Sequence, residues 1–173
     1  MRLQWETDYA LRCVLCLALK PNEWVRAAEL ADLVKVPEQM ARKILTRLCT
    51  AGILEGKPGP KGGLRLALPA EKISVYDVVC CIEGEMCINR CLGPDGFCTR
   101  NGVPGCGVHR YLRSLQDQME QSMRAMTFDL ILAQNEEVVN AAGDLLEEAS
   151  ARMPGNEHLC PVLAEYQCRN ASG

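Results

Sequence analysis

The chain has 173 residues, of which 48% are hydrophobic and 5% are aromatic, and its formal net charge is −3. This composition excludes a disordered chain and predicts a globular domain of ordinary size with an aliphatic core. The N-terminus carries Glu6 and Asp8 where a secretory signal needs positive charge, and no apolar run is long enough to cross a bilayer. We therefore interpret the eleven cysteines as reduced thiols or metal ligands of a cytoplasmic protein with no membrane partner.

The chain begins with an apolar segment that has helical periodicity. Thr7 or Asp8 can cap this first helix, which is expected to run to about Lys20. A short extended segment of two residues, Trp24 and Val25, follows this helix and leads into the next one.

Residues 27–34 and 37–51 predict two helices joined by a tight turn, the second of them ended by Gly52. A basic second helix in this arrangement is typical of a helix-turn-helix, whose second helix enters the major groove of double-stranded DNA. The region 35–65 holds seven basic and two acidic residues, so it is a positive patch on an acidic protein. The side chains expected to contact DNA from this helix are Gln39, Arg42, Lys43 and Arg47.

The segments 53–55 and 64–68 predict two short strands around the Gly/Pro-rich turn 56–63. Together they form a β-hairpin wing. Lys57 and Lys61 lie in the turn and are expected to contact phosphate or the minor groove.

Ser74 is a predicted cap for a fourth helix over 75–83, which ends at Gly84. A cysteine-rich loop over 85–107 follows, and then a long helix over 108–126. Apolar residues recur along this helix in steps of three and four, as in a coiled-coil seam: Val108, Leu112, Leu115, Met119, Ser122 or Met123, and Met126. We expect a homodimer that associates through this helix.

The predicted fold is mainly α, a winged helix-turn-helix with a small β-hairpin wing and a long dimerisation helix. Two shorter helices are expected after the long one, over 128–134 and 136–149. The expected units are the DNA-binding domain 1–84, the cluster-binding loop 85–107, the dimerisation and C-terminal helices 108–150, and a flexible tail 151–173.

Three cysteines of this loop and a histidine just after it have the spacing C-x6-C-x7-C-x2-H: Cys91, Cys98, Cys106 and His109. A loop so rich in Gly and Pro cannot hold its shape by packing, whereas thiolates that converge on a metal can hold it. The donors suit zinc or an iron–sulfur cluster. Cys106 and His109 lie one helical turn apart and can therefore reach one metal centre.

Over residues 1–135 the chain resembles the Rrf2 family of bacterial winged-helix regulators, the group that contains IscR, NsrR and RirA. The order and spacing of several fragments carry the resemblance: Met1-Arg2-Leu3, Thr7-Asp8-Tyr9-Ala10-Leu11-Arg12, Leu48 with Gly52-Ile53-Leu54, Gly59-Pro60-Lys61-Gly62-Gly63-Leu64, and Ile73-Ser74-Val75-Tyr76-Asp77-Val78-Val79 before Glu83-Gly84. The three loop cysteines and the long helix complete it.

The resemblance implies a homodimer with an iron–sulfur cluster in the loop, and promoter binding that depends on the state of the cluster. His109 as fourth ligand resembles IscR and implies a 2Fe-2S cluster. Asp8 of the partner subunit resembles the alternative found in NsrR and implies a 4Fe-4S cluster. Because its spacing is local, His109 is the favoured ligand.

The sequence therefore predicts a transcriptional regulator that senses redox state, nitric oxide or iron, and it predicts no enzyme. The alternatives are a zinc-stabilised regulator and a thiol/disulfide sensor without a cluster. The signal, the promoters and the direction of regulation are not encoded in recognisable motifs. The sequence does not determine the roles of the remaining cysteines. Cys87 can substitute as a ligand, and five others lie on apolar helix faces and are expected to be small core residues: Cys13, Cys16, Cys49, Cys80 and Cys81. Cys160 and Cys168 either form a reversible disulfide or have no role.

Overall fold

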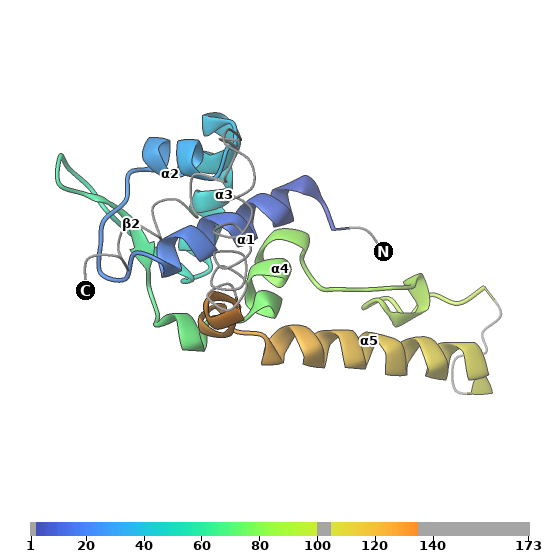
Figure 1. Cartoon of the computed structure of the whole chain (residues 1–173). Coiled ribbons are helices and arrows are strands. Elements are labelled where there is room, and N and C mark those ends of the chain that lie inside the picture. The colour runs from blue at the N-terminus through green and yellow to red at the C-terminus, as the bar shows by residue number, and fades with distance from the viewer. Residues whose placement is uncertain (1–2, 100–104, 135–173) are drawn as a thin grey trace, which may run out of the picture.

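A computed structural model describes residues 3–99 and 105–134 of the chain (Figure 1). Its elements are α1 (Trp5–Ala18), α2 (Ala27–Leu33), α3 (Glu38–Thr50), β1 (Leu54–Lys57), β2 (Gly63–Leu66), η1 (Ala70–Lys72), α4 (Val75–Glu83), η2 (Arg90–Leu92) and α5 (Gly107–Ala125). Residues 128–134 are also helical. The predicted fold class, mainly helical with one antiparallel hairpin, is confirmed. In the part of the chain that the structure describes, no helix has the length and apolar character needed to span a bilayer.

Helix α1 lies at the centre of the core and packs against α3 and α4. Ala10, Cys13, Val14 and Leu17 are almost fully buried, and their spacing places them on one face of the helix. The predicted cap at Thr7 or Asp8 is wrong, because α1 begins at Trp5 and no side chain caps it. Thr7 is instead wholly buried inside the helix.

The helix-turn-helix is formed by α2 and α3. Lys35 adopts a left-handed conformation in the turn between them, with φ of 56°. At the end of α3, Gly52 has φ of 73°, and the Ile53 N–H donates to the Leu48 carbonyl oxygen at 3.0 Å. This is the hydrogen-bond pattern of a glycine C-cap, so the predicted end of the helix is confirmed.

The wing pairs β1 with β2 in the register Glu55 to Arg65 and Lys57 to Gly63. Val25 adds a third strand position, since its N–H and carbonyl group bond to Leu64 at 3.0 and 2.8 Å. A Cβ on Gly63 would lie 2.6 Å from the Val25 carbonyl oxygen, so only glycine permits this close approach. Both the predicted hairpin and the extended residues at 24–25 are confirmed. Lys57, however, lies at the end of β1 and not in the turn, because the strands pair as far as Lys57 and Gly63.

Helix α4 begins and ends where its sequence predicts. Ser74 and Asp77 form a reciprocal capping box at its start. Gly84 follows the last residue with φ of 82°, which turns the chain into the cysteine loop. The loop therefore leaves the domain directly from the carboxyl end of α4.

Helix α5 lies along one side of the molecule, and the chain then returns to the core (Figure 1). The Val75 N–H donates to the Met126 carbonyl oxygen at 2.9 Å, and the Phe128 N–H donates to that of Ile73 at 3.1 Å. Phe128 is 1% exposed within the core. The helical residues 128–134, which the sequence grouped with the dimerisation segment, thus pack on the N-terminal unit. The predicted helix 136–149 and tail 151–173 lie outside the described residues.

Candidate DNA-binding surface and cysteine loop

Three of the predicted DNA-contacting residues are exposed on α3: Gln39, Arg42 and Lys43. Arg42 Nη2 lies 2.6 Å from Glu38 Oε1, and Lys43 Nζ lies 2.9 Å from Glu6 Oε1. The Arg42–Glu38 pair is exposed on both sides, and such pairs contribute little to stability, so a phosphate group can replace that carboxylate at small cost. Lys43 is itself exposed, although its partner Glu6 is half-buried. The amino-terminal half of α3 therefore offers one amide and two cations to a ligand.

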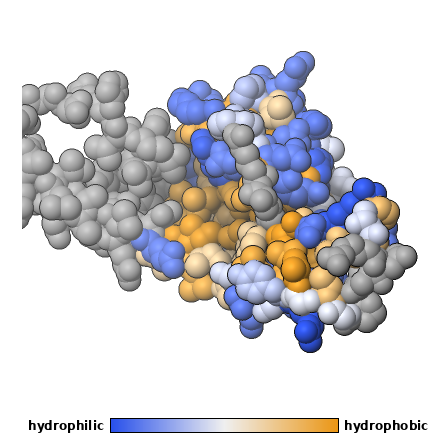
Figure 2. Space-filling view, turned by 90° about the vertical axis from the view of Figure 1, so that its right-hand side faces the viewer, coloured by the Kyte–Doolittle hydropathy of each residue, from blue (hydrophilic) through white to orange (hydrophobic). Residues whose placement is uncertain are grey.

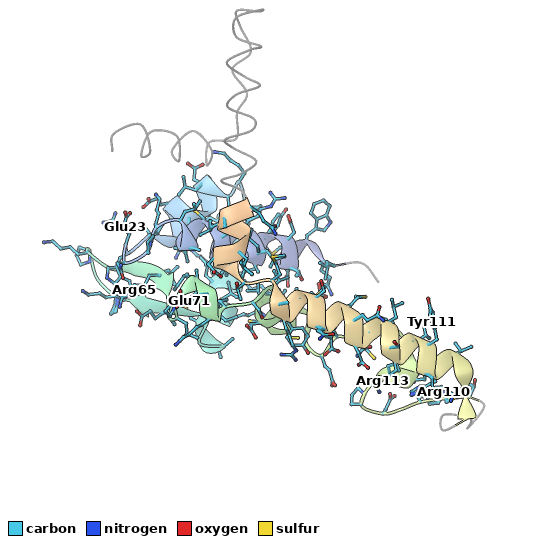
Figure 3. All side chains as sticks on the ribbon, turned by 60° about the horizontal axis from the view of Figure 1, so that its bottom comes forward. Glu23, Arg65, Glu71, Arg110, Tyr111 and Arg113 are labelled. Atoms are coloured by element: carbon cyan, nitrogen blue, oxygen red, sulfur yellow. The ribbon has the colours of Figure 1, made fainter. Side chains whose placement is uncertain are left out.

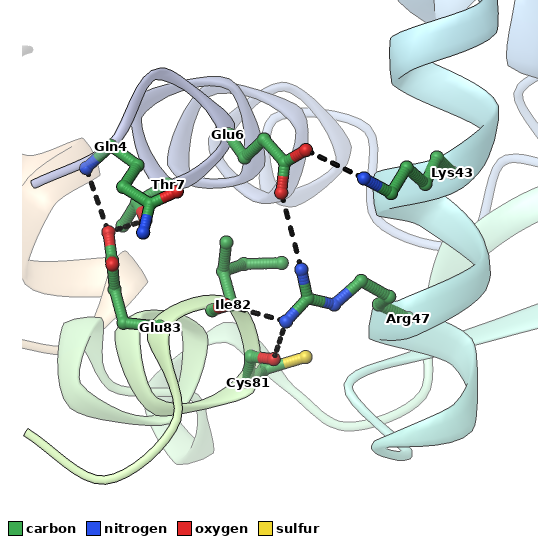
Figure 4. Close-up of polar contacts among 8 residues, drawn as sticks. All are labelled: Gln4, Glu6, Thr7, Lys43, Arg47, Cys81, Ile82 and Glu83. Carbon is green, nitrogen blue, oxygen red and sulfur yellow. Dashed lines mark hydrogen bonds and ion pairs between the residues drawn. The ribbon is translucent and has the colours of Figure 1, made fainter.

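Arg47 differs from these three residues because its guanidinium points into the molecule (Figure 4). It donates to the carbonyl oxygens of Cys81 and Ile82 at 3.0 and 2.6 Å, and it lies 3.3 Å from Glu6 Oε2. The carbonyl groups at a helix carboxyl end carry partial negative charge, which favours a cation there. Arg47 thus connects the recognition helix to the end of α4.

A second contact joins the same end of α4 to the start of α1 (Figure 4). Glu83 Oε1 accepts hydrogen bonds from the Gln4 N–H at 2.8 Å and from the Thr7 hydroxyl. The Thr7 hydrogen bond is the largest cause of a lowered pKa of the Glu83 carboxyl. The Thr7 hydroxyl therefore joins α1 to α4. It does not cap α1, because the helix begins two residues before it.

The wing lysines differ in their surroundings. The Lys57 ammonium lies 5.7 Å from the centroid of the Trp24 ring, and Lys61 is exposed at the turn. The Arg65 guanidinium lies 4.4 Å from the same ring and pairs with Glu55. Trp24 and Arg65 were not among the residues predicted to act at the wing, although the extended residues 24–25 mark the strand that brings this ring to the wing.

The first part of the cysteine loop is held against α5 by a buried amide. Gln116 is 4% exposed, and its Oε1 accepts from the Ile88 N–H at 3.2 Å. Its Nε2 donates to Glu120 at 3.0 Å, and the other oxygen of Glu120 accepts from the Tyr76 hydroxyl at 3.3 Å. These bonds connect the loop, α5 and α4.

The three predicted thiol ligands, Cys91, Cys98 and Cys106, are all half-buried. Cys87 is exposed, and its thiol donates to the Asn89 carbonyl oxygen at 3.1 Å. Within residues 3–99 and 105–134, no three Cys, His, Asp or Glu side chains converge closely enough to hold a metal ion. Residues 100–104, which connect Cys98 to Cys106, lie outside the described part.

His109 Nδ1 is a buried atom with no hydrogen-bond partner. Because a buried polar atom without a partner is costly, such atoms are rare and call for an explanation. A bound metal would satisfy this nitrogen, and thiols with an imidazole are the donor types that zinc and iron–sulfur clusters take. Asp8 Oδ2 also lacks a hydrogen bond, but it lies 2.6 Å from Arg12 Nη2 in an ion pair.

Burial affects three cysteine thiols of the helical core, Cys13, Cys49 and Cys81. Cys13 and Cys16 are buried in α1, and burial raises the pKa of Cys13 to about 12. Burial also raises the pKa of Cys49 and of Cys81. Since the thiolate is the form that binds metals and reacts, these side chains act as small apolar groups.

The wing and the loop lie at opposite ends of the molecule. Figure 3 shows Arg65 of the wing at one end, and Arg110, Tyr111 and Arg113 of α5 at the other, beside the loop. Helix α3 is connected to the helix end from which the loop leaves, through the bonds of Arg47 to the carbonyl groups of Cys81 and Ile82.

The comparisons with known proteins agree with this architecture. The model of the Rrf2 family, described as an iron-dependent transcriptional regulator, matches residues 3–134. The transcriptional repressor NsrR of Streptomyces coelicolor is 35% identical over 136 residues, which cover 77% of this chain and 90% of that protein. The regulator IscR of Photorhabdus laumondii is 28% identical over 144 residues, covering 83% and 85%.

Two solved structures match the fold. CymR, described as the global cysteine regulator of B. subtilis, has a TM-score of 0.65 at 16% identity and covers 78% of this chain and 98% of that one. IscR of T. potens has a TM-score of 0.60 at 18% identity, covering 90% and 94%. These proteins are regulators rather than enzymes, as the sequence predicted. Because the family match runs through the helix-turn-helix, the wing, the loop and α5, the chain belongs to the Rrf2 family of bacterial transcriptional regulators.

Proposed function

We propose that this regulator is a homodimer whose promoter binding is gated by an iron–sulfur cluster held in the cysteine loop. The observation that carries the proposal is His109 Nδ1, a buried nitrogen with no hydrogen-bond partner in the first turn of α5, three residues after Cys106. The loop supplies three thiols that suit iron. The same loop leaves α4 beside the residues that contact α3.

The proposed DNA-binding surface combines α3 and the wing: Gln39, Arg42, Lys43, Lys57 and Lys61. Gln can pair with adenine, and Arg or Lys can pair with guanine, in the major groove. Two copies of α3 in a dimer must lie about 34 Å apart to read successive major grooves on one side of the duplex. We assign Arg47 to positioning α3 instead, because its guanidinium faces α1 and α4.

The proposed dimer contact is an apolar seam on α5. Of the predicted seam residues, Val108 and Leu115 are 65% and 38% exposed, and the others that are apolar are half-buried: Leu112, Met119, Met123 and Met126. Tyr111, which the predicted seam did not include, lies three residues after Val108 and four before Leu115, so it is on the same face, and it is 68% exposed. Figure 2, which looks at this end of the molecule, shows apolar surface between polar side chains. Exposed apolar patches of this kind mark association sites.

The proposed ligands are Cys91, Cys98, Cys106 and His109, with Asp8 of the partner subunit as the alternative to His109. A bound cluster supplies an anchor whose stability depends on its oxidation state. The chain's own contacts transmit the state of the loop. Gln116 holds Ile88 to α5, and Arg47 holds the carboxyl end of α4 to α3.

The test of cluster binding is the visible absorption spectrum of protein purified without oxygen, together with its iron, sulfide and zinc content. About two irons per chain with equal sulfide support His109, and about four support Asp8 of the partner subunit. A colourless protein with one zinc overturns the redox role. A metal-free protein whose DNA affinity responds to peroxide supports the thiol/disulfide alternative.

The test of gating is the substitution Cys98→Ala. We expect loss of the cluster and a change in promoter affinity of about five- to 150-fold, the usual range of coupling between two sites. Cys13→Ala, which removes a buried thiol outside the loop, is the matched control and retains the iron. Equal promoter binding by the loaded protein and by the Cys98 variant overturns gating at that promoter.

A further inference from the structure

Three consecutive residues before α2 contact the wing, each in a different way. The Trp24 ring lies against Lys57 and Arg65, and the Val25 backbone pairs with Leu64. Arg26 Nη2 donates to the Pro60 carbonyl oxygen at 2.7 Å, in the turn of the hairpin. One short segment therefore contacts both the strands and the turn of the wing.

The strand register explains why these contacts fall on one face. Val25 is paired with Leu64, so Trp24 is next to Arg65, and Arg65 is paired with Glu55. Lys57 is two residues after Glu55 and therefore lies on the same face of the sheet. Trp24, Arg65, Glu55 and Lys57 thus form one outward-facing row.

The opposite face is apolar and turns toward the core. Val25 and Leu54 are 2% exposed, and Leu64 and Leu66 pack against the core. Because the inner face fixes the sheet in place, the outer row is presented at a defined position relative to α3. Arg65 contacts both the Glu55 carboxylate and the Trp24 ring, and the other two cations of the wing are Lys57 and Lys61.

We propose that Trp24 and Arg26 are positioning residues that preorganise the wing for DNA, a role that rests on the proposed function. Trp24 places Lys57 through a cation–π contact, and Arg26 holds the turn that carries Lys61. A two-stranded hairpin alone is marginally stable in water, and its turn here is rich in glycine. Ordering the wing before binding removes an entropy cost that each freely rotating lysine would otherwise incur on DNA.

The test is equilibrium binding to a labelled duplex recovered from a random-sequence pool, measured over a series of salt concentrations. Trp24→Leu is expected to weaken binding about three- to tenfold, the cost of immobilising a long side chain. The slope of log affinity against log salt is expected to stay at the wild-type value, because Lys57 still reaches phosphate. Lys57→Ala, by contrast, is expected to lower the slope by about one.

A double-mutant cycle separates positioning from a direct DNA contact. If Trp24 acts through Lys57, the variant with both substitutions binds like Lys57→Ala alone. Trp24→Phe is expected to restore most of the affinity, since phenylalanine retains an aromatic face for the ammonium. Additive effects of Trp24→Leu and Lys57→Ala, or wild-type binding by Trp24→Leu, overturn the role of Trp24.

Arg26→Gln tests the second contact on a residue whose side chain is exposed, so the fold does not depend on it. We expect a weakening of about three- to tenfold with an unchanged salt slope. Lys72→Ala, which removes a cation from η1 outside the wing, is the matched control and binds like wild type. If the wild-type protein selects no duplex from the pool, the proposed function fails. If the wild-type protein selects a duplex and both Trp24→Leu and Arg26→Gln bind it as tightly as wild type, only this inference fails.

Discussion

The N-terminal unit and the α5 end of the molecule differ in how completely their side chains are packed. In the N-terminal unit the buried polar residues Thr7 and Ser74 both have hydrogen-bond partners. Of the 19 residues of α5, by contrast, the buried one is Gln116. At the same end His109 Nδ1 has no partner, and Tyr111 is 68% exposed.

This difference indicates where the chain by itself forms a packed core. The N-terminal unit contains the hydrophobic core, and its buried Thr7 and Ser74 are hydrogen-bonded, although Trp5 at its start is 67% exposed and Asp8 Oδ2 has an ion pair in place of a hydrogen bond. The loop and α5 leave apolar side chains exposed and a buried nitrogen unpaired, so we infer that this end is completed by a bound group and a second copy. Four substitutions test that contrast.

The largest expected effect comes from Phe128, which lies after α5 in the chain but inside the N-terminal core. Phe128→Ala should lower the free energy of unfolding by about 3–5 kcal/mol, because it leaves a large cavity. Urea unfolding followed by circular dichroism measures the loss. Leu130→Ala, at a residue that is 45% exposed in the same helical segment, is the control and should change the free energy by about 0.5 kcal/mol or less. Equal effects of the two would place Phe128 outside the core.

The next effect concerns association through the α5 seam. Tyr111→Glu should weaken dimerisation by about a hundredfold or more, since a twofold interface contains the substitution twice. Sedimentation equilibrium measures the dimer constant, and the unfolding of the N-terminal unit should be unchanged. Arg113→Glu, on the side of α5 away from the seam, is the matched charge-changing control. Dimers of normal stability in Tyr111→Glu would locate the interface elsewhere.

A smaller effect is expected at Arg47, which connects α3 to the end of α4. Arg47→Ala should lower the free energy of unfolding by about 1–3 kcal/mol, because it removes charge-assisted hydrogen bonds. The salt slope of DNA binding should stay unchanged, since the guanidinium faces inward. Arg42→Ala, which removes an exposed cation from the same helix, should lower the slope by about one with little change in stability. A lowered slope in Arg47→Ala, without loss of stability, would assign Arg47 to DNA.

The smallest effect is a pH dependence at Glu83. The Thr7 hydroxyl lowers the pKa of the folded carboxyl, so its stabilisation is present above the ordinary glutamate pKa of about 4.3 and is lost as pH falls through the folded value. Glu83→Gln should therefore reduce stability by less than about 1 kcal/mol at neutral pH, and the difference should vanish in acid. Urea unfolding at several pH values measures it. Glu71→Gln on η1 is the control, and a difference that grows in acid would contradict the assignment.

The sequence by itself determined the elements whose signals are local. Ser74 and Asp77 cap α4 as predicted, because a capping box needs only residues three positions apart. Gly52 ends α3 for a similar reason, since a left-handed residue after a helix favours glycine. The candidate ligands could also be proposed from the sequence, because thiols and an imidazole are recognised by residue type and by their spacing along the chain.

The tertiary structure alone decided where polar side chains point and which distant segments meet. Thr7 resembles a helix cap in sequence, yet it is buried between α1 and α4. Its hydroxyl donates a hydrogen bond to Glu83, which lies on a helix far along the chain. Arg47 lies on a basic helix, yet its guanidinium turns toward the carbonyl groups at the end of α4. Phe128 returns to the core through backbone bonds that join the end of α5 to the start of α4. Such contacts depend on the packing of whole helices, and helical periodicity carries no information about which face of one helix meets another.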